Sequence, residues 1–242
     1  MAQIFSNFYE SWICNLEKLH QELLVVCSAT NEVVKVERSD EQLQALVAKV
    51  TAHLKEYYTF KWATACDEVP DFFSPPWLSP LENAFMWMTG WKPAVVLRLL
   101  ETLKKQEALV LSEEQGRKMQ DLRVRISMQE ERVEAEMERL QVSVAGCRMM
   151  ELSKVAAHGT GDDIMAEVAL NGIIMGMERI MKAADCVRLK TLKGILDVLT
   201  PMQCVDFLAI EIAMHLRLRQ WGKKDMTARE NRNQNQNQDN NN

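Results

Sequence analysis

The sequence predicts an all-α fold, a single bundle of about six to seven helices with a long central helix. Glycine and proline number 9 and 6 in 242 residues, roughly half the share found in an average protein. All-β folds and doubly wound folds need more of both residues for their turns and loops. Apolar residues also recur at spacings of three and four, and three Ser- or Thr-led motifs have the form of helix N-caps.

The first predicted helix carries one apolar stripe, which begins within the first ten residues. A polar stretch over residues 37–40 ends that pattern, and a second amphipathic helix runs from about Leu43 to about Cys66. Because both stripes follow the helical period, each helix is expected to bury one face. The stripe of the first helix comprises Phe5, Phe8, Trp12, Leu16, Leu19, Leu23 and Val26.

A proline-broken linker is predicted over residues 67–78, and a capping box follows it. Ser79 is the N-cap, proline stands at the first helical position, and the carboxylate of Glu82 reaches back to the cap. The short apolar helix that begins here is expected to end at Gly90. Pro93 then opens another short helix, which runs through Leu103.

A long charged helix is predicted to begin at a second capping box, over residues 112–115. Two glycines within residues 158–161 are predicted to end this helix. A helix-breaking turn is favoured there over a glycine-rich oxyanion loop, because the sequence has no nucleophile motif to accompany such a loop. The next helix is expected to run from about Ile164 to Leu199.

The last predicted helix begins at a third capping motif, led by Thr200, and ends near Trp221. Residues 222–242 are polar and end in a run of Asn and Gln, so they are predicted to be a disordered tail. With no flexible linker inside residues 5–221, this range is expected to form one domain.

The charge balance argues against a free-standing nucleic-acid binder, because 29 basic residues stand against 34 acidic ones. The six cysteines are widely separated, which is typical of reduced and mostly buried thiols. No leader peptide or membrane-spanning run is predicted. A location in the nucleus, the cytoplasm or both is expected.

No catalytic or metal-binding constellation is evident, and an enzyme is the least favoured class. The four histidines are far apart, and His215 has Glu211 one helical turn before it. Structural or surface roles are favoured for the histidines, with haem ligation as the alternative. The carboxylate-rich run over residues 130–139 is interpreted as a solvated helix face, and an acidic docking surface is the alternative.

Three further patterns have a structural interpretation and a functional alternative. Gly172 and Gly176 fit a small-xxx-small pattern, which favours close packing of two helices. The 15 methionines favour core filling over an adaptable groove for a fatty acid or a peptide. Cations near the end of the last helix complement its dipole, and a nuclear-import or weak nucleic-acid patch is the alternative.

Three stretches together resemble a plant family, the Delay of Germination domain, which is also the C-terminal domain of TGA-type bZIP factors. They are residues 8–12 (Phe-Tyr-Glu-Ser-Trp), residues 73–93 with their tryptophans and prolines, and residues 189–219 around Leu199 and Thr200. The resemblance covers residues 5–221. Its motifs make interaction candidates of Trp12, Trp77, Glu82, Trp87, Gly90 and Pro93.

The resemblance implies a regulatory protein of seed dormancy, abscisic-acid signalling or related development, acting through protein partners. Protein phosphatases and transcription regulators are the partner classes that it implies. It also implies binding of haem, for which His215 is the candidate ligand, or of a fatty acid. No basic region and zipper precede the domain, so direct DNA binding is not expected. The leading hypothesis is a non-enzymatic regulator, followed by a ligand sensor and then a DNA-binding factor.

Overall fold

The computed structural model describes residues 2–29, 39–65, 68–144, 146 and 163–239, and within them the fold is all-α, as predicted. The described residues form eight helices and no strand. One short helix that was not predicted, over residues 69–73, lies inside the expected linker. The helices are α1 (Ala2–Ala29), α2 (Asp40–Thr64), α3 (Val69–Phe73), α4 (Pro80–Ala84), α5 (Pro93–Lys105), α6 (Glu113–Val144), α8 (Asp163–Leu196) and α9 (Pro201–Asp239).

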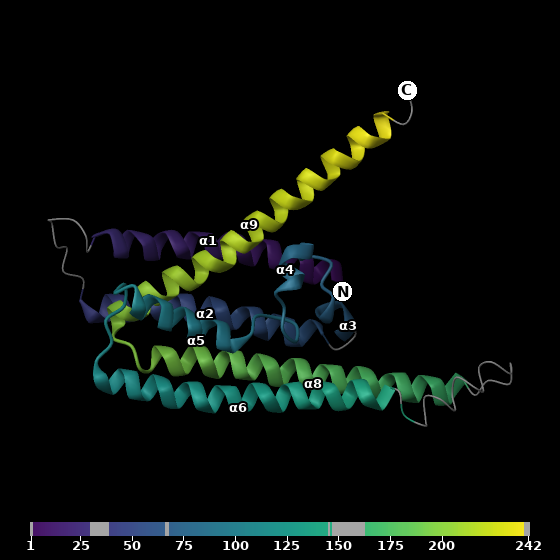
Figure 1. The fold of residues 1–242 in the computed structure, drawn as a ribbon, viewed down its shortest axis with the longest axis horizontal. Helices are drawn as coiled ribbons and strands as arrows, with labels where there is room; N and C mark the ends of the chain where they lie inside the picture. Colours follow the sequence, from purple (N-terminus) through teal and green to yellow (C-terminus); the bar gives the residue numbers. More distant parts are fainter. Residues whose placement is uncertain (1, 30–38, 66–67, 145, 147–162, 240–242) are drawn as a thin grey trace.

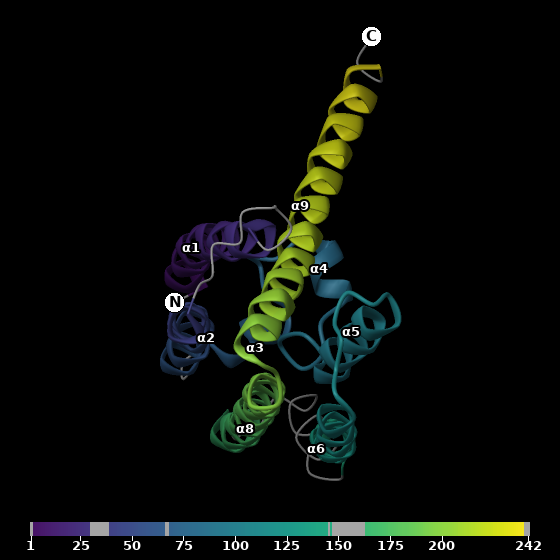
Figure 2. The same ribbon diagram turned by 90° about the vertical axis from the view of Figure 1, so that its left-hand side faces the viewer.

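The helices form two paired layers that α9 crosses. The antiparallel helices α6 and α8 lie side by side along one edge of the molecule, and α1 pairs with α2 on the other (Figure 1). The N-terminal part of α9 packs on both α1 and α2, while its C-terminal part projects beyond the other helices (Figure 2). Of the helices, α9 therefore has the longest unsupported end.

All three predicted capping motifs are present. The Ser79 Oγ accepts from the Glu82 amide at 3.2 Å, and the Glu82 carboxylate accepts from the Ser79 amide at 2.8 Å. Ser112 with Gln115, and Thr200 with Gln203, make the same reciprocal pair of hydrogen bonds. These side chains satisfy amides that a helix start leaves without intrahelical partners.

The predicted helix from Ser79 to Gly90 is shorter than expected, because α4 ends at Ala84. Met88 and Thr89 have φ angles of 46° and 72°, in the left-handed region that an α-helix cannot use. Trp87 and Gly90 then pair as an isolated β-bridge. The chain therefore turns sharply within residues 73–93, the stretch of tryptophans and prolines that is called the aromatic motif below.

The predicted linker is part of the hydrophobic core. Phe5 of α1 lies with its ring centroid 4.8 Å from that of Phe72 and 4.7 Å from that of Trp77. All three side chains are buried, together with Met181 of α8. Aromatic side chains bury large areas, so this cluster fixes the proline-rich segment on the N-terminal end of α1.

The predicted end of the last helix near Trp221 is wrong, because α9 continues to Asp239. One glycine inside a helix costs only about 1 kcal/mol relative to alanine, and Lys, Arg, Gln and Met, which follow it, favour helix. Gly222 instead allows close approach to α4. A Cβ at this position would lie 2.8 Å from the Ser79 Cβ and closer still to its Oγ.

Replacing Gly222 with alanine is expected to lower the free energy of unfolding by about 1–3 kcal/mol, because the added methyl overpacks the contact with Ser79. Gly172→Ala is the matched control. Its Cβ meets no atom within 4 Å, so it should stabilise α8 by about 0.5–1 kcal/mol. Urea unfolding of both variants measures the difference, and equal effects would mean that α9 does not pack on α4 at Gly222.

The small-xxx-small pattern on α8 is half correct. A Cβ on Gly176 would lie 2.8 Å from Leu140 of α6, so this glycine does permit close helix packing, whereas Gly172 faces open space. Cys14, Cys27, Cys186 and Cys204 form no disulfide with any described residue, and the predicted burial is correct for Cys204 alone of these four. The turn predicted at residues 158–161 lies outside the described residues. None of the described helices is both long and apolar enough to cross a bilayer.

Candidate functional site

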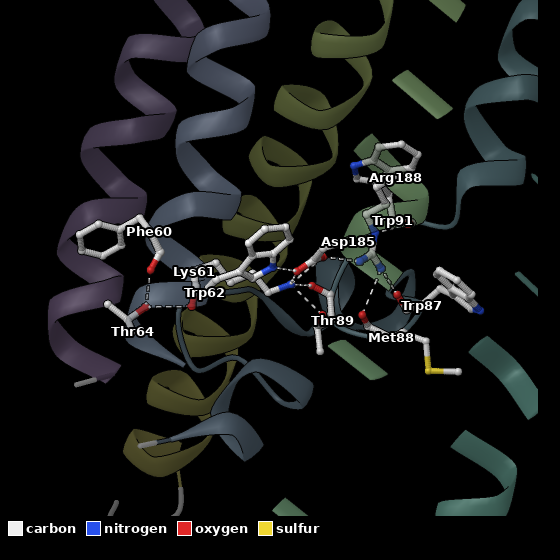
Figure 3. Close-up of polar contacts among 10 residues, drawn as sticks. All are labelled: Phe60, Lys61, Trp62, Thr64, Trp87, Met88, Thr89, Trp91, Asp185 and Arg188. Atoms are coloured by element: carbon white, nitrogen blue, oxygen red, sulfur yellow. Dashed lines mark hydrogen bonds and ion pairs between the residues drawn. The ribbon is translucent and has the colours of Figure 1, made fainter. Parts of the chain in front are cut away.

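A fully buried ionic network connects α2, α8 and the turn that follows α4. The Lys61 ammonium donates to Asp185 Oδ1 at 3.0 Å, to Thr89 Oγ1 at 2.7 Å and to the Thr89 carbonyl at 3.2 Å (Figure 3). The Trp62 indole donates to Asp185 Oδ2 at 3.0 Å. Burial lowers the pKa of Lys61 to about 8, against the opposing effect of Asp185. Because these groups are buried, each of them depends on the others for its hydrogen bonds and for the balance of its charge.

Arg188 of α8 binds the backbone of the aromatic motif. Its Nη1 donates to Asp185 Oδ1 at 2.6 Å and its Nε to the Trp91 carbonyl at 2.7 Å, while Nη2 donates to the carbonyls of Trp87 and Met88 (Figure 3). The Arg188 Cζ also lies 5.3 Å from the Trp87 ring centroid. One guanidinium therefore fixes the whole turn.

The close approach of the Arg188 guanidinium to the backbone leaves room only for glycine at position 90. A Cβ on Gly90 would lie 2.8 Å from the Arg188 Cζ and 2.9 Å from its Nε. Four hydrogen-bond acceptors hold the guanidinium, so it cannot move aside without losing them.

Two carboxylates of α6 hold the other side of the motif. Glu130 Oε1 accepts from the Ala94 amide at 2.7 Å, at the start of α5. Glu134 Oε1 accepts from the Trp87 indole at 2.8 Å and from the Lys92 ammonium at 2.7 Å. The interpretation of residues 130–139 as a solvated face is therefore wrong for Glu130, which is 5% exposed. The Glu134 side chain is 41% exposed, and Glu131, Glu136 and Glu138 are exposed. Burial raises the pKa of Glu130.

A second buried ion pair joins α1, α4 and α9. The Arg219 Nη1 lies 3.3 Å from Glu82 Oε1, and its Nη2 contacts Glu10 of α1. The guanidinium carbon lies 4.8 Å from the Tyr9 ring centroid. Glu82 also accepts from the Ser79 hydroxyl at 2.6 Å. Glu82 thus serves as a helix cap and as the counterion of Arg219.

A cavity of about 170 Å³ lies between these two networks. Its walls are mainly aromatic and aliphatic. Four of the sequence-predicted candidates line it, namely Trp12, Trp77, Glu82 and Gly90. The other two do not, since Trp87 binds Arg188 and Glu134, and Pro93 is buried at the first turn of α5. The motif therefore both packs the core and supplies part of a cavity wall.

His215 also lines the cavity, beside Glu211. Its Nδ1 lies 3.1 Å from Glu211 Oε1, and its side chain is 30% exposed. Burial lowers the pKa of His215, but the Glu211 carboxylate raises it more, so the net pKa lies above the ordinary value.

A haem does not fit this arrangement. Pockets that hold drug-sized ligands measure roughly 300–1,000 Å³, and the cavity beside His215 measures about 170 Å³. The contact with Glu211 favours a protonated imidazole, whereas an axial ligand must be neutral. In the described part of the chain, no group of three or more His, Cys, Asp or Glu side chains is arranged to hold a metal ion.

The residues at the centre of the site, Lys61, Asp185 and Arg188, were not predicted from the sequence. The one local signal is that Asp185 and Arg188 are charged residues three positions apart on an otherwise apolar part of α8. If this apolar face of α8 is buried, the two charged side chains need hydrogen-bond or ion-pair partners on other elements, but the sequence does not identify those partners.

Comparisons with known proteins confirm the resemblance in the sequence. The DOG1 family model, described as seed dormancy control, matches residues 5–102. Protein DOG1-like 4 of Arabidopsis thaliana is 46% identical over 221 residues, which are 91% of this chain and 92% of that protein. Protein RESPONSE TO ABA AND SALT 1 of the same plant is 30% identical over 224 residues, 90% of this chain and 94% of that protein.

A transcription factor is also among the relatives. Transcription factor TGA2.3 of Oryza sativa subsp. japonica is 27% identical over 219 residues, 90% of this chain but 63% of that factor. The matched region is therefore nearly the whole length of some relatives and only part of the length of others. On the identity and coverage shared with DOG1-like 4, this chain belongs to the DOG1 family of plant proteins.

Proposed function

We propose that this chain is a non-enzymatic regulator that binds protein partners in seed-dormancy or abscisic-acid-type control, in the nucleus, the cytoplasm or both. The family description and the name of the relative RESPONSE TO ABA AND SALT 1 support the process. Protein phosphatases and transcription regulators, including TGA-type factors, are the partner classes we propose. The absence of a basic excess supports action through proteins rather than through direct binding of DNA.

The observation that carries the proposal is the exposed surface of the C-terminal half of α9. Trp221 is 59% exposed and Met226 is 40% exposed, although the neighbouring Gly222 contacts Ser79, and α9 then continues until its C-terminal end projects beyond the other helices (Figure 2). Trp, Met and Arg are the residues that protein interfaces favour. Five exposed cations accompany them, so we propose an acidic partner surface. These cations are Arg217, Lys223, Lys224, Arg229 and Arg232.

Binding to purified partners tests this proposal. We expect a TGA-type factor or a plant protein phosphatase to bind the full chain in isothermal titration, and Trp221→Ala to weaken that binding about thirtyfold, because interface tryptophans are frequent hot spots. Met128→Ala on the exposed face of α6 is the control and should bind as the parent chain does. Binding by neither partner class would contradict the proposal, and salt-sensitive binding of duplex DNA would favour the DNA-associated alternative.

A further inference from the structure

The cavity opens to the surface near the end of α4, which packs on α9 (Figure 2). Phe85 follows the last residue of α4 and lines the cavity, although it is 66% exposed. Because an exposed side chain cannot line a closed void, the cavity must reach the surface beside Phe85.

The opposite side of this opening is formed by α9. Two contacts set the register of α4 on α9, namely Ser79 with Gly222 and Glu82 with Arg219. The residue numbers of these contacts run in opposite directions, so one turn further along α4 the chain lies beside the part of α9 near residues 215–218. Leu218 lines the cavity and is partly buried. Phe85 and Leu218 therefore lie on opposite sides of the opening.

The interior behind the opening is apolar and has room for one aromatic ring. Aromatic and aliphatic side chains dominate its walls, among them Trp77, Trp91 and Leu192. The volume of about 170 Å³ is close to the roughly 150 Å³ of an engineered apolar cavity that binds benzene. The charged groups Asp185 and Arg188 of the wall are already bound to each other and to further protein groups. The interior therefore offers a ligand mainly van der Waals contact.

The surface beside the opening is aromatic and basic. Trp221 lies three residues after Leu218, on the same side of α9, and it is 59% exposed. Arg217 and Lys224 are exposed about one turn before and one turn after Trp221, and neither makes an ion pair with a described residue. An acidic segment would complement the charge of this surface.

A protein segment can cover the surface and fill the cavity at the same time. A small molecule in the cavity would leave Phe85 and Trp221 exposed, and exposed apolar patches mark sites of protein interaction. Hot-spot residues of protein interfaces are often aromatic and occupy such pockets. A long acyl chain is disfavoured, because the cavity is smaller than the roughly 300–1,000 Å³ of pockets that hold drug-sized ligands.

We infer that the protein partner docks on α4 and α9 through an acidic segment and inserts one aromatic side chain, of the size of phenylalanine, into the cavity. This inference rests on the proposed function and adds the chemistry of the segment that binds. A partner that binds without using the cavity would leave the proposed function intact and overturn this inference alone.

Toluene, which represents the side chain of phenylalanine, provides the first test. In isothermal titration of the full chain, it is expected to bind with a stoichiometry of one. At about ten times its Kd, toluene should weaken the binding of a TGA-type factor or a plant protein phosphatase about tenfold, because the two compete for the cavity. No saturable heat with toluene, or an unchanged partner affinity at saturating toluene, would overturn the inference. If neither partner class binds without toluene, the proposed function fails and the inference fails with it.

Variants of the cavity provide the second test. Leu192→Phe fills the cavity and is expected to abolish toluene binding and to weaken partner binding about thirtyfold, whereas the same exchange at the exposed Leu24 of α1 should change neither. Phe85→Ala should weaken the partner about tenfold, with the exposed Val110→Ala as its control. Far-UV circular dichroism and thermal unfolding verify that each variant is folded.

Two outcomes of the variant experiment would overturn the inference. The first is partner binding that is unchanged in a folded Leu192→Phe variant. The second is palmitate that binds the parent chain more tightly than toluene does and loses this binding in the Leu192→Phe variant, because a lipid would then be the occupant of the cavity.

A charge exchange tests the acidic character of the segment. The double variant Arg217→Gln with Lys224→Gln is expected to weaken partner binding about tenfold at low ionic strength, and to leave toluene binding unchanged. Arg132→Gln with Arg139→Gln is the control, because it removes the same charge from the exposed face of α6. Equal partner affinities of the two double variants would contradict an acidic segment and overturn the inference.

Discussion

Replacing Asp185 with alanine is expected to lower the free energy of unfolding by about 3–5 kcal/mol, because breaking a buried ion pair leaves an uncompensated charge in the interior. Asp185 is the shared acceptor of Lys61, Arg188 and the Trp62 indole. Without it, two fully buried cations face each other with only hydroxyl and carbonyl oxygens as acceptors. The variant should also loosen the turn that Arg188 holds.

Urea unfolding followed by far-UV circular dichroism measures this change. The matched control is Asp197→Ala, which removes an aspartate from an exposed pair with Lys193 one helical turn away. Such exposed pairs contribute about 0–1 kcal/mol. Similar losses in the two variants would show that Lys61 and Arg188 remain solvated without Asp185, and the buried network would then have no special role in stability.

Glu82→Ala is expected to lower the free energy of unfolding by about 2–4 kcal/mol, combining the loss of a helix cap with the loss of a buried counterion. Its carboxylate accepts from the Ser79 amide and hydroxyl, and it faces the buried Arg219 of α9. Arg219 keeps Glu10 as a partner, so the expected loss is smaller than for Asp185.

The same unfolding experiment applies, with Glu114→Ala as the control. Glu114 also lies in the first turn of a helix, but it makes only an exposed pair with Lys118. We expect Glu114→Ala to leave the free energy of unfolding almost unchanged, because exposed ion pairs contribute little to stability. Glu82→Gln should fall between the two, since the amide can still accept from Ser79 without neutralising Arg219. A Glu82→Ala variant as stable as the control would mean that α9 does not rely on this carboxylate.

Local signals were sufficient to predict most of the helices. The stripe from Phe5 to Val26 gave α1, and the caps at Ser79, Ser112 and Thr200 gave the starts of α4, α6 and α9. These signals act within one or two helical turns, so they are visible in a single sequence. The aromatic motif was correctly located for the same reason, through its tryptophans and prolines.

The contacts that build the site depend on residues distant in sequence. Lys61 and Asp185 are 124 positions apart, and no periodicity connects them. Glu130 and Glu134 resemble their solvated neighbours until α5 and the turn are placed beside them. Gly222 was interpreted as a helix end because its effect on helix propensity is local, whereas its contact with Ser79 is tertiary.

The contact of Arg219 with Glu10 spans 209 positions of the chain, and this separation affects synthesis. Ribosomes add about 5–20 residues per second, so α1 waits roughly 10–40 s in the growing chain before its partner on α9 is made. During that time the apolar face of α1, from Phe5 to Val26, can pack on α2 and on the segment with Phe72 and Trp77, but the surface that α9 covers has no partner yet. Nascent chains of this protein should therefore bind chaperones until α9 leaves the ribosome.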